Sequence, residues 1–208
     1  MANLTDLSQS VVTGNIAQVK EQTQSLVDAG TEPLKIVNEG LIAGMNIVGP
    51  RFKNGEMFVP EVLMSAKAMA VGMEIVKPLI SDKDMPSKGT IVLGTVKGDL
   101  HDIGKNLVGM MIGGSGFKVI DLGIDIAPEK FIAAIKEHNP DIVAMSALLT
   151  TTMVSMKDTI DLIKEEGLTV KCIVGGAPIS QEFANEIGAD GYAADAASAS
   201  ELCAELVG

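Results

Sequence analysis

The stretch GDLHDIGKN, residues 98–106, lies between two apolar runs of different period. Before it comes TIVLGTV, residues 90–96, which is β-branched and continuous, as in a buried strand. After it, Leu107 and Met111 continue an apolar pattern of helical period. The stretch is therefore expected to be the loop between a strand and a helix, at the end of the strand where open α/β sheets bind ligands. His101 in this loop is a candidate ligand-binding residue.

The glycines of the stretch do not match a nucleotide-binding loop. The dinucleotide-binding motif GxGxxG is absent. Five residues separate Gly98 from Gly104, whereas four separate the two glycines of a P-loop. Asn106 also stands where a P-loop needs Ser or Thr. Asp99 can instead accept a hydrogen bond from one ring nitrogen of His101, which fixes the tautomer and leaves the other nitrogen free for a ligand. The residues alone leave this open, because a loop histidine can also lie beside an aspartate by chance.

The chain after residue 88 alternates between strand-like and helix-like patterns. Strands are expected at residues 90–96, 118–123, 141–148, 170–176 and 191–195. Helices are expected between them and at the end of the chain. This alternation requires parallel pairing with right-handed crossovers, and continuous apolar strands indicate that both faces of the sheet are covered. Residues 89–208 are thus predicted to form an α/β domain, a Rossmann-like (flavodoxin-like) five-stranded parallel sheet.

Residues 1–80 are predicted to be helical throughout. Their apolar positions recur in steps of three, four and seven, which places them on one face of each helix. The third helix is expected over about residues 31–50, and the fourth over residues 60–78 with Pro78 at its end. Helices of this length predict an all-α four-helix bundle that precedes the sheet as a cap domain. The polar segment SDKDMPSK, residues 81–88, is the expected linker.

Composition excludes several classes of protein. No apolar run approaches the roughly 20 residues that a bilayer requires, so no membrane span is expected. The start MANLTDLSQS lacks the basic end and apolar core of a signal peptide, which favours a cytoplasmic location. A net charge of −11 without tryptophan opposes nucleic-acid binding. Cys172 and Cys203 lack metal-site spacing and are expected to be small core residues.

Three motifs at the ends of predicted strands together resemble those of cobalamin-binding domains. DLHDIG, residues 99–104, looks like the family's DxHxxG signature. Ser146-Ala147-Leu148 resembles its SxL motif, and Gly175-Gly176 resembles its GG motif. In the family, the histidine replaces the cofactor's own dimethylbenzimidazole as the lower axial ligand to cobalt. The displaced nucleotide tail enters a slot where small glycines leave room and the serine can bond the buried base.

The resemblance also covers the N-terminal helices. RFKNGEMFVPEVLMSAKAM, residues 51–69, is similar to the helical cap of methyl-carrying corrinoid proteins. Phe52 and Val59 fall where that cap presents side chains over the methyl-bearing face of the corrin, although Val is smaller than the usual Leu, and core packing is the alternative role for both. Thr152 falls where the family has a serine that bonds Asp99, so its β-branched side chain is a departure.

The resemblance assigns residues to a cobalamin or related corrinoid cofactor. The assigned positions are Asp99, His101, Asp102, Ile103, Gly104, Ser146, Leu148, Thr152, Gly175, Gly176, Phe52 and Val59. His101 is the implied cobalt ligand. A larger side chain at Gly176 is expected to block the slot while the fold survives.

The function that this resemblance implies is that of a corrinoid methyl carrier. Such a protein accepts a methyl group on Co(I) from a substrate-specific methyltransferase and delivers it to a second methyltransferase that acts on tetrahydrofolate or a carrier thiol. A reductive activator is a further implied partner. The chain resembles the corrinoid subunits of methylamine, quaternary-amine, methanol and methoxy-aromatic demethylation systems, and the related module of methionine synthase. No residue resembles a substrate-activating site, so the chain itself is expected to carry rather than catalyse.

Two other functions use similar domains. A cobalamin-dependent sensor would add a basic DNA-binding helix-turn-helix. The small subunit of a cobalamin mutase would not need the cap that shields a methyl group. The sequence of the cap therefore favours the methyl carrier.

Overall fold

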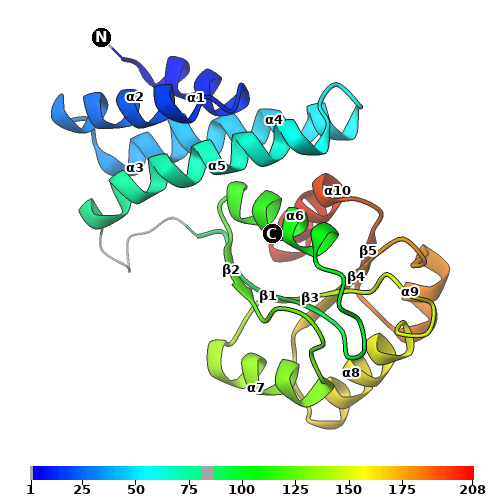
Figure 1. Cartoon of the computed structure of the whole chain (residues 1–208). Helices are drawn as coiled ribbons and strands as arrows, with labels where there is room; N and C mark the ends of the chain where they lie inside the picture. The colour runs from blue at the N-terminus through cyan, green and yellow to red at the C-terminus, as the bar shows by residue number, and fades with distance from the viewer. Residues whose placement is uncertain (1, 81–86) are drawn as a thin grey trace. The chain divides into compact units, whose positions relative to one another are not determined.

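The computed structural model describes residues 2–80 and 87–208. Most of the predicted linker, residues 81–86, lies outside the described residues. The chain divides into an N-terminal helical unit and a second unit that comprises Lys88–Gly113 and Phe117–Gly208 (Figure 1). Among the described residues, no helix combines the length and the apolar character needed to cross a membrane.

The N-terminal unit consists of helical segments joined by short turns. They are α1 (Leu4–Val12), α2 (Ile16–Asp28), α3 (Pro33–Lys35), the π-helix η1 (Ile36–Ile42), α4 (Ala43–Lys53), α5 (Val59–Val76) and the 3-10 turn η2 (Lys77–Leu79). Asn3 and Asn15 begin the first two helices, because their side chains accept hydrogen bonds from free backbone N–H groups of the first turn. Leu7, Val19 and Val62 are fully buried, which places the apolar stripes in the core of the unit.

The third helical stretch is longer than predicted. Segments α3, η1 and α4 follow one another without a break, and Pro50 lies inside α4 rather than at its end. Pro50 sits in the last turn, where its carbonyl still accepts from the Asn54 N–H at 2.9 Å. The stretch ends because Gly55 takes a φ of +74°, the left-handed conformation that terminates many helices. The prediction that the helix ends near Pro50 is therefore wrong by one turn.

The second unit is the predicted α/β domain. Its strands are β1 (Thr90–Thr95), β2 (Lys118–Asp121), β3 (Ile142–Ser146), β4 (Lys171–Gly175) and β5 (Gly191–Ala193). Its helices are α6 (Ile103–Gly114), α7 (Pro128–His138), α8 (Val154–Glu165), α9 (Gln181–Ile187) and α10 (Ala196–Val207). Over residues 88–208 the strands form one parallel sheet in the order β2-β1-β3-β4-β5. The predicted Rossmann-like, five-stranded fold is thus confirmed.

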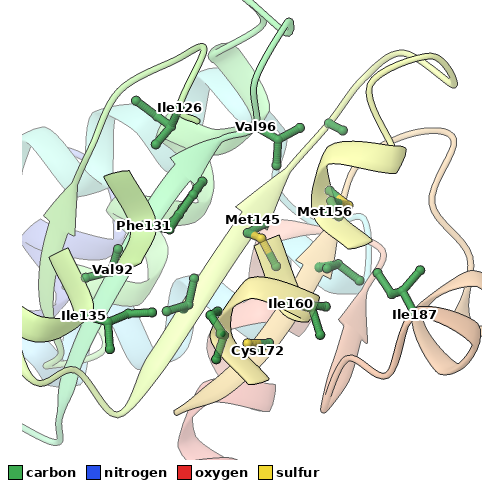
Figure 2. Close-up of a cluster of buried hydrophobic side chains, with 14 of the residues drawn as sticks. Val92, Val96, Ile126, Phe131, Ile135, Met145, Met156, Ile160, Cys172 and Ile187 are labelled. Atoms are coloured by element: carbon green, nitrogen blue, oxygen red, sulfur yellow. The ribbon is translucent and has the colours of Figure 1, made fainter. Parts of the chain in front are cut away.

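Both faces of this sheet are covered by helices (Figure 1). Val92 and Met145 point to one face, where Phe131 of α7 and Ile160 of α8 belong to the same large apolar cluster (Figure 2). Their neighbours along the strands point to the other face, which α6 and α10 cover. Burial on both sides explains why the strands are continuously apolar rather than alternating.

The two cysteines lie in these apolar clusters. Cys172 belongs to the cluster under α7 and α8, and Cys203 to the cluster on the opposite face. Burial raises the pKa of both thiols to about 12, so neither is a thiolate near neutral pH. The prediction that they serve as small core residues is confirmed.

Candidate functional site

The three sequence motifs meet at one edge of the sheet. Thr95 at the end of β1 pairs with Ser146 at the end of β3, and Ser146 pairs with Gly175 at the end of β4. The loops that follow these strands therefore start at the same level, beside one another. Because the strands are parallel, the loops after their carboxyl ends lie at the same edge of the sheet, where one ligand can contact several of them.

Asp99 is the buried centre of this edge. It has no exposed surface, yet five donors in the described part of the chain reach its carboxylate. Oδ1 accepts from Nδ1 of His101 at 2.7 Å and from its backbone N–H at 3.1 Å. Oδ2 accepts from the Thr152 hydroxyl at 2.7 Å and from the N–H groups of Leu148 and Leu149 at 2.7 and 3.2 Å. Both oxygens are thus held in fixed directions.

These hydrogen bonds decide the charge of Asp99. Burial by itself would raise the pKa of this carboxyl, but bonds from Thr152, from the Leu148 N–H and from His101 hold the pKa well below its usual range. Asp99 is therefore an anion at every pH near neutrality. A buried anion beside Nδ1 favours the tautomer of His101 that carries its proton there.

His101 is held on one side and open on the other. Its side chain is 51% exposed although Nδ1 is bonded to the buried Asp99. Its backbone carbonyl accepts from the Thr95 hydroxyl at 2.9 Å, which anchors the loop to the end of β1. With Nδ1 engaged, Nε2 is the ring nitrogen that offers a lone pair to a ligand.

Thr152 takes the place predicted for it despite its β-branched side chain. It is 7% exposed and lies in the turn before α8. Its hydroxyl also lies 2.9 Å from the Leu149 carbonyl, but the one proton it can donate is held more strongly by the charged Asp99. The threonine therefore completes a hydrogen-bonded set with Asp99 and His101.

Exposed apolar side chains flank His101. Leu100 is 66% exposed, Ile103 79% and Leu148 43%, values that are high for large aliphatic residues. A Cβ placed on Gly104 would meet no atom within 4 Å, so the first turn of α6 is open at this point. Asp102 is exposed and accepts from the Asn106 side chain at 3.0 Å within that turn. An imidazole with an apolar surround and open space beside it is suited to a large, partly apolar ligand.

The two glycines at the end of β4 are required by the backbone itself. Gly176 has a φ of +137°, and a Cβ there would lie 1.8 Å from the carbonyl oxygen of Ala147. A Cβ on Gly175 would lie 2.9 Å from the carbonyl oxygen of Ala193. The expectation that a larger residue at Gly176 leaves the fold intact is therefore wrong, because the clash is with main chain of the same sheet domain.

Phe52 and Val59 belong to the N-terminal unit. Phe52 is half-buried in α4, and Val59 is 37% exposed as the first residue of α5. Between them lies Phe58, which is 68% exposed and was not singled out from the sequence. The role of Phe52 and Val59 over a corrin stays a prediction.

The sequence analysis did not identify the hydrogen-bond donors to Asp99 or the ion pair of Lys105, which come from other parts of the fold. The N–H groups of Leu148 and Leu149 carry no residue-type signature, so no sequence pattern could identify them. Lys105 is 3% exposed and pairs with the carboxylate of Asp121 at the end of β2. Lys105 carries a sequence signal for this ion pair, because a lysine on the apolar side of a helix suggests a buried partner.

Comparison with known proteins gives a consistent result. Two models described as B12 binding domain match residues 89–201 and residues 4–77. The chain is 48% identical, over its whole length and 99% of the relative's, to a corrinoid protein of Desulfitobacterium hafniense. It is 44% identical to the dimethylamine corrinoid protein of Methanosarcina barkeri, with 97% of this chain and 98% of that protein covered.

A solved structure agrees with these relatives. It is that of the methanol:cobalamin methyltransferase complex of Methanosarcina barkeri, in which one chain is 32% identical and superimposes with a TM-score of 0.89. The match covers 97% of this chain and 78% of that one. With the site geometry and two matched models in agreement, the chain belongs to the family of B12-binding domain proteins.

Proposed function

We propose that this chain is a corrinoid-binding methyl carrier of a methyltransferase system. The observation that carries the proposal is the half-exposed imidazole of His101, whose Nδ1 is fixed by a fully buried carboxylate. Relatives named as corrinoid proteins of methylamine systems support it, since the similarity runs over both units.

The residues at the sheet edge fit a corrinoid. His101 would hold the cobalt of such a group through Nε2, the ring nitrogen that is not hydrogen-bonded to Asp99. The exposed Leu100, Ile103 and Leu148 give an apolar surface that a broad macrocycle can cover. The open space at Gly104 leaves room for such a group beside the histidine.

When bound, the corrinoid supplies a cobalt that can take up a methyl group and yield it to an acceptor. The chain's own residues orient the imidazole of His101. Asp99 keeps the proton of His101 on Nδ1, which leaves Nε2 as the ring nitrogen that would ligate the metal. Thr152 and the N–H of Leu148 keep the carboxylate of Asp99 from turning away.

The proposal includes partner enzymes. A substrate-specific methyltransferase would load the methyl group, and a second methyltransferase would pass it to tetrahydrofolate or a carrier thiol, with a reductive activator to restore the cofactor. The methanol:cobalamin methyltransferase complex supports the first of these partners by analogy. In this scheme Phe52 and Val59 of the N-terminal unit would shield the methyl group.

Axial ligation by His101 tests the proposal. The protein loaded with hydroxocobalamin should show the absorption spectrum of histidine-ligated cobalt(III). His101→Ala should retain bound corrinoid but lose that spectrum. His138→Ala is the matched control, because His138 lies at the exposed last turn of α7.

Two results would contradict the proposal. Absence of corrinoid binding by the wild-type chain would overturn it entirely, and an unchanged spectrum in His101→Ala would overturn the assignment of the ligand. A loaded protein that accepts no methyl group from any methylamine or methanol methyltransferase would instead favour a sensor or mutase subunit.

A further inference from the structure

We propose that Asp125, in the loop between β2 and α7, is a positioning residue for His101. The inference rests on the proposed function and deepens it, because it concerns how the axial nitrogen is held in place. The hydrogen bonds of Asp125 go to Gly98 and Asp99, so Asp125 would act on His101 through the backbone of these two residues.

Asp125 forms two hydrogen bonds with the loop that carries His101. Its carboxylate Oδ1 accepts from the Gly98 N–H at 2.7 Å. Its own backbone N–H donates to the Asp99 carbonyl at 3.1 Å. Asp125 is thus hydrogen-bonded, through its side chain and its main chain, to two consecutive residues of the loop that carries His101.

The backbone of Asp125 has a conformation that is uncommon for a residue other than glycine. Its φ is +54°, and only one other non-glycine residue in the described chain, Asn139, has a positive φ. Asn139 has an ordinary reason, since it ends helix α7 in the left-handed conformation. Asp125 ends no helix. Strain of this kind persists where surrounding contacts enforce it and is concentrated at functional sites.

The C-terminal end of the loop that carries His101 also bonds to the segment that contains Asp125, residues 121–125. Lys105, in the first turn of α6, is buried and pairs with Asp121, the last residue of β2. Asp121 also accepts from the Gly123 N–H at 2.8 Å, which shapes the β2–α7 loop itself. The loop that carries His101 is therefore braced at its beginning and at its end by residues 121–125.

Such bracing matters because Asp99 has to serve several donors at once. A rotation or shift of its backbone would move the carboxylate away from Thr152 and from the N–H of Leu148. The same movement would release Nδ1 of His101. Ligand groups act only within about 0.5 Å of their productive geometry, so a loosened Asp99 would loosen the axial nitrogen as well.

Three variants separate the effect of the Asp125 carboxylate from the effect of the positive φ at this position. Asp125→Gly accepts the positive φ without cost but has no carboxylate. Asp125→Asn keeps an oxygen acceptor and tolerates a positive φ, so it should retain the hydrogen bond from the Gly98 N–H. Asn139→Gly is the control, because it changes the other positive-φ position, at the end of α7.

The first measurement uses the protein without cofactor. Amide hydrogen exchange at Leu148 and Leu149 reports whether the Asp99 carboxylate still accepts from them. Asp125→Gly should speed their exchange by about tenfold or more, the scale expected when bonds to a charged acceptor weaken. Exchange in α10 should not change. Asp125→Asn and Asn139→Gly should match the wild type.

The second measurement uses the chain loaded with cobalamin and reduced to cobalt(II). In protein labelled with 15N-histidine, the doublet splitting from 15N in the electron paramagnetic resonance spectrum reports the fraction of cobalt that is ligated by His101, because the unlabelled base of the cofactor would give a triplet. This fraction should fall severalfold in Asp125→Gly at constant corrinoid content and return in Asp125→Asn. A purely structural role would lower corrinoid content or speed exchange everywhere without changing the ligated fraction.

The outcomes distinguish this inference from the proposed function. Wild-type exchange at Leu148 together with a wild-type ligated fraction in Asp125→Gly would overturn the positioning role while leaving the carrier function intact. A wild-type chain that binds no cobalamin would overturn the proposed function and, with it, the role of Asp125 in ligation.

Discussion

The hydroxyl of Thr152 donates to the carboxylate of Asp99 at 2.7 Å, although 53 positions separate the two residues in the chain. Neither group is exposed to an appreciable degree, so the bond forms in surroundings that strengthen it. Through Asp99 it reaches His101, and it therefore links the turn before α8 to the loop after β1.

Removal of the Thr152 hydroxyl should destabilise the protein. Thr152→Val keeps the shape of the side chain but takes one donor from a buried anion, at a cost of about 1.5–3 kcal/mol in the free energy of unfolding. Thr152→Ser keeps the donor and should lie much closer to the wild type. Denaturant unfolding of the three proteins measures the difference, and equal values for Val and Ser would show that the hydroxyl contributes nothing.

Asp99 should make the protein sensitive to acid. Its pKa is lowered in the folded state from the ordinary value of 3.8, so its contribution is fully present well above 3.8 and is lost as the pH falls through that value toward the folded pKa. Asp99→Asn should be less stable at neutral pH but should lose less stability between about pH 5 and pH 2. Urea unfolding across this range tests the sign, and parallel curves for the two proteins would contradict it.

Gly104 and Gly176 should respond in opposite ways to substitution. Gly104→Leu adds a side chain in open space within a helix, so it should stabilise the fold by up to about 1 kcal/mol while reducing corrinoid binding. Gly176→Ala adds a Cβ against the Ala147 carbonyl at a positive φ and should destabilise the fold by more than about 1 kcal/mol. Thermal unfolding and cobalamin titration of both variants provide the comparison. Full cobalamin affinity in Gly104→Leu would place the cofactor elsewhere.

Ile103 should contribute to binding rather than to folding. It is 79% exposed, so Ile103→Ser should change the free energy of unfolding by no more than about 0.5 kcal/mol. The same change removes apolar surface beside His101 and should weaken cobalamin binding several-fold. Ala133→Ser is a matched control, since Ala133 is exposed on α7, which covers the opposite face from α6. Equal affinities for the two variants would argue against an apolar contact at Ile103.

Local pattern was enough to predict much of the fold and part of the site. Strand and helix periods differ, and continuous apolar strands can only be buried on both faces, so the parallel sheet of residues 88–208 followed from composition and spacing. The bond between Asp99 and His101 spans two positions, and it too could be anticipated from the sequence. The end of α4 was misjudged because a proline inside a helix removes one donor while its carbonyl can still accept, as Pro50 does from the Asn54 N–H, whereas Gly55 in the left-handed conformation ends the helix.

The remaining features depend on which segments meet. Leu148 supplies its N–H to Asp99 from 49 positions away, and Asp125 reaches Gly98 across 27 positions. A backbone N–H has no residue identity, and a single aspartate in a loop has no period, so neither can be recognised along the chain. They converge because β1 lies between β2 and β3 in the sheet, which brings the loops after all three strands together around the loop of His101. Strand order is a property of the packed sheet, and it sets the surroundings of the histidine that the sequence had already supplied.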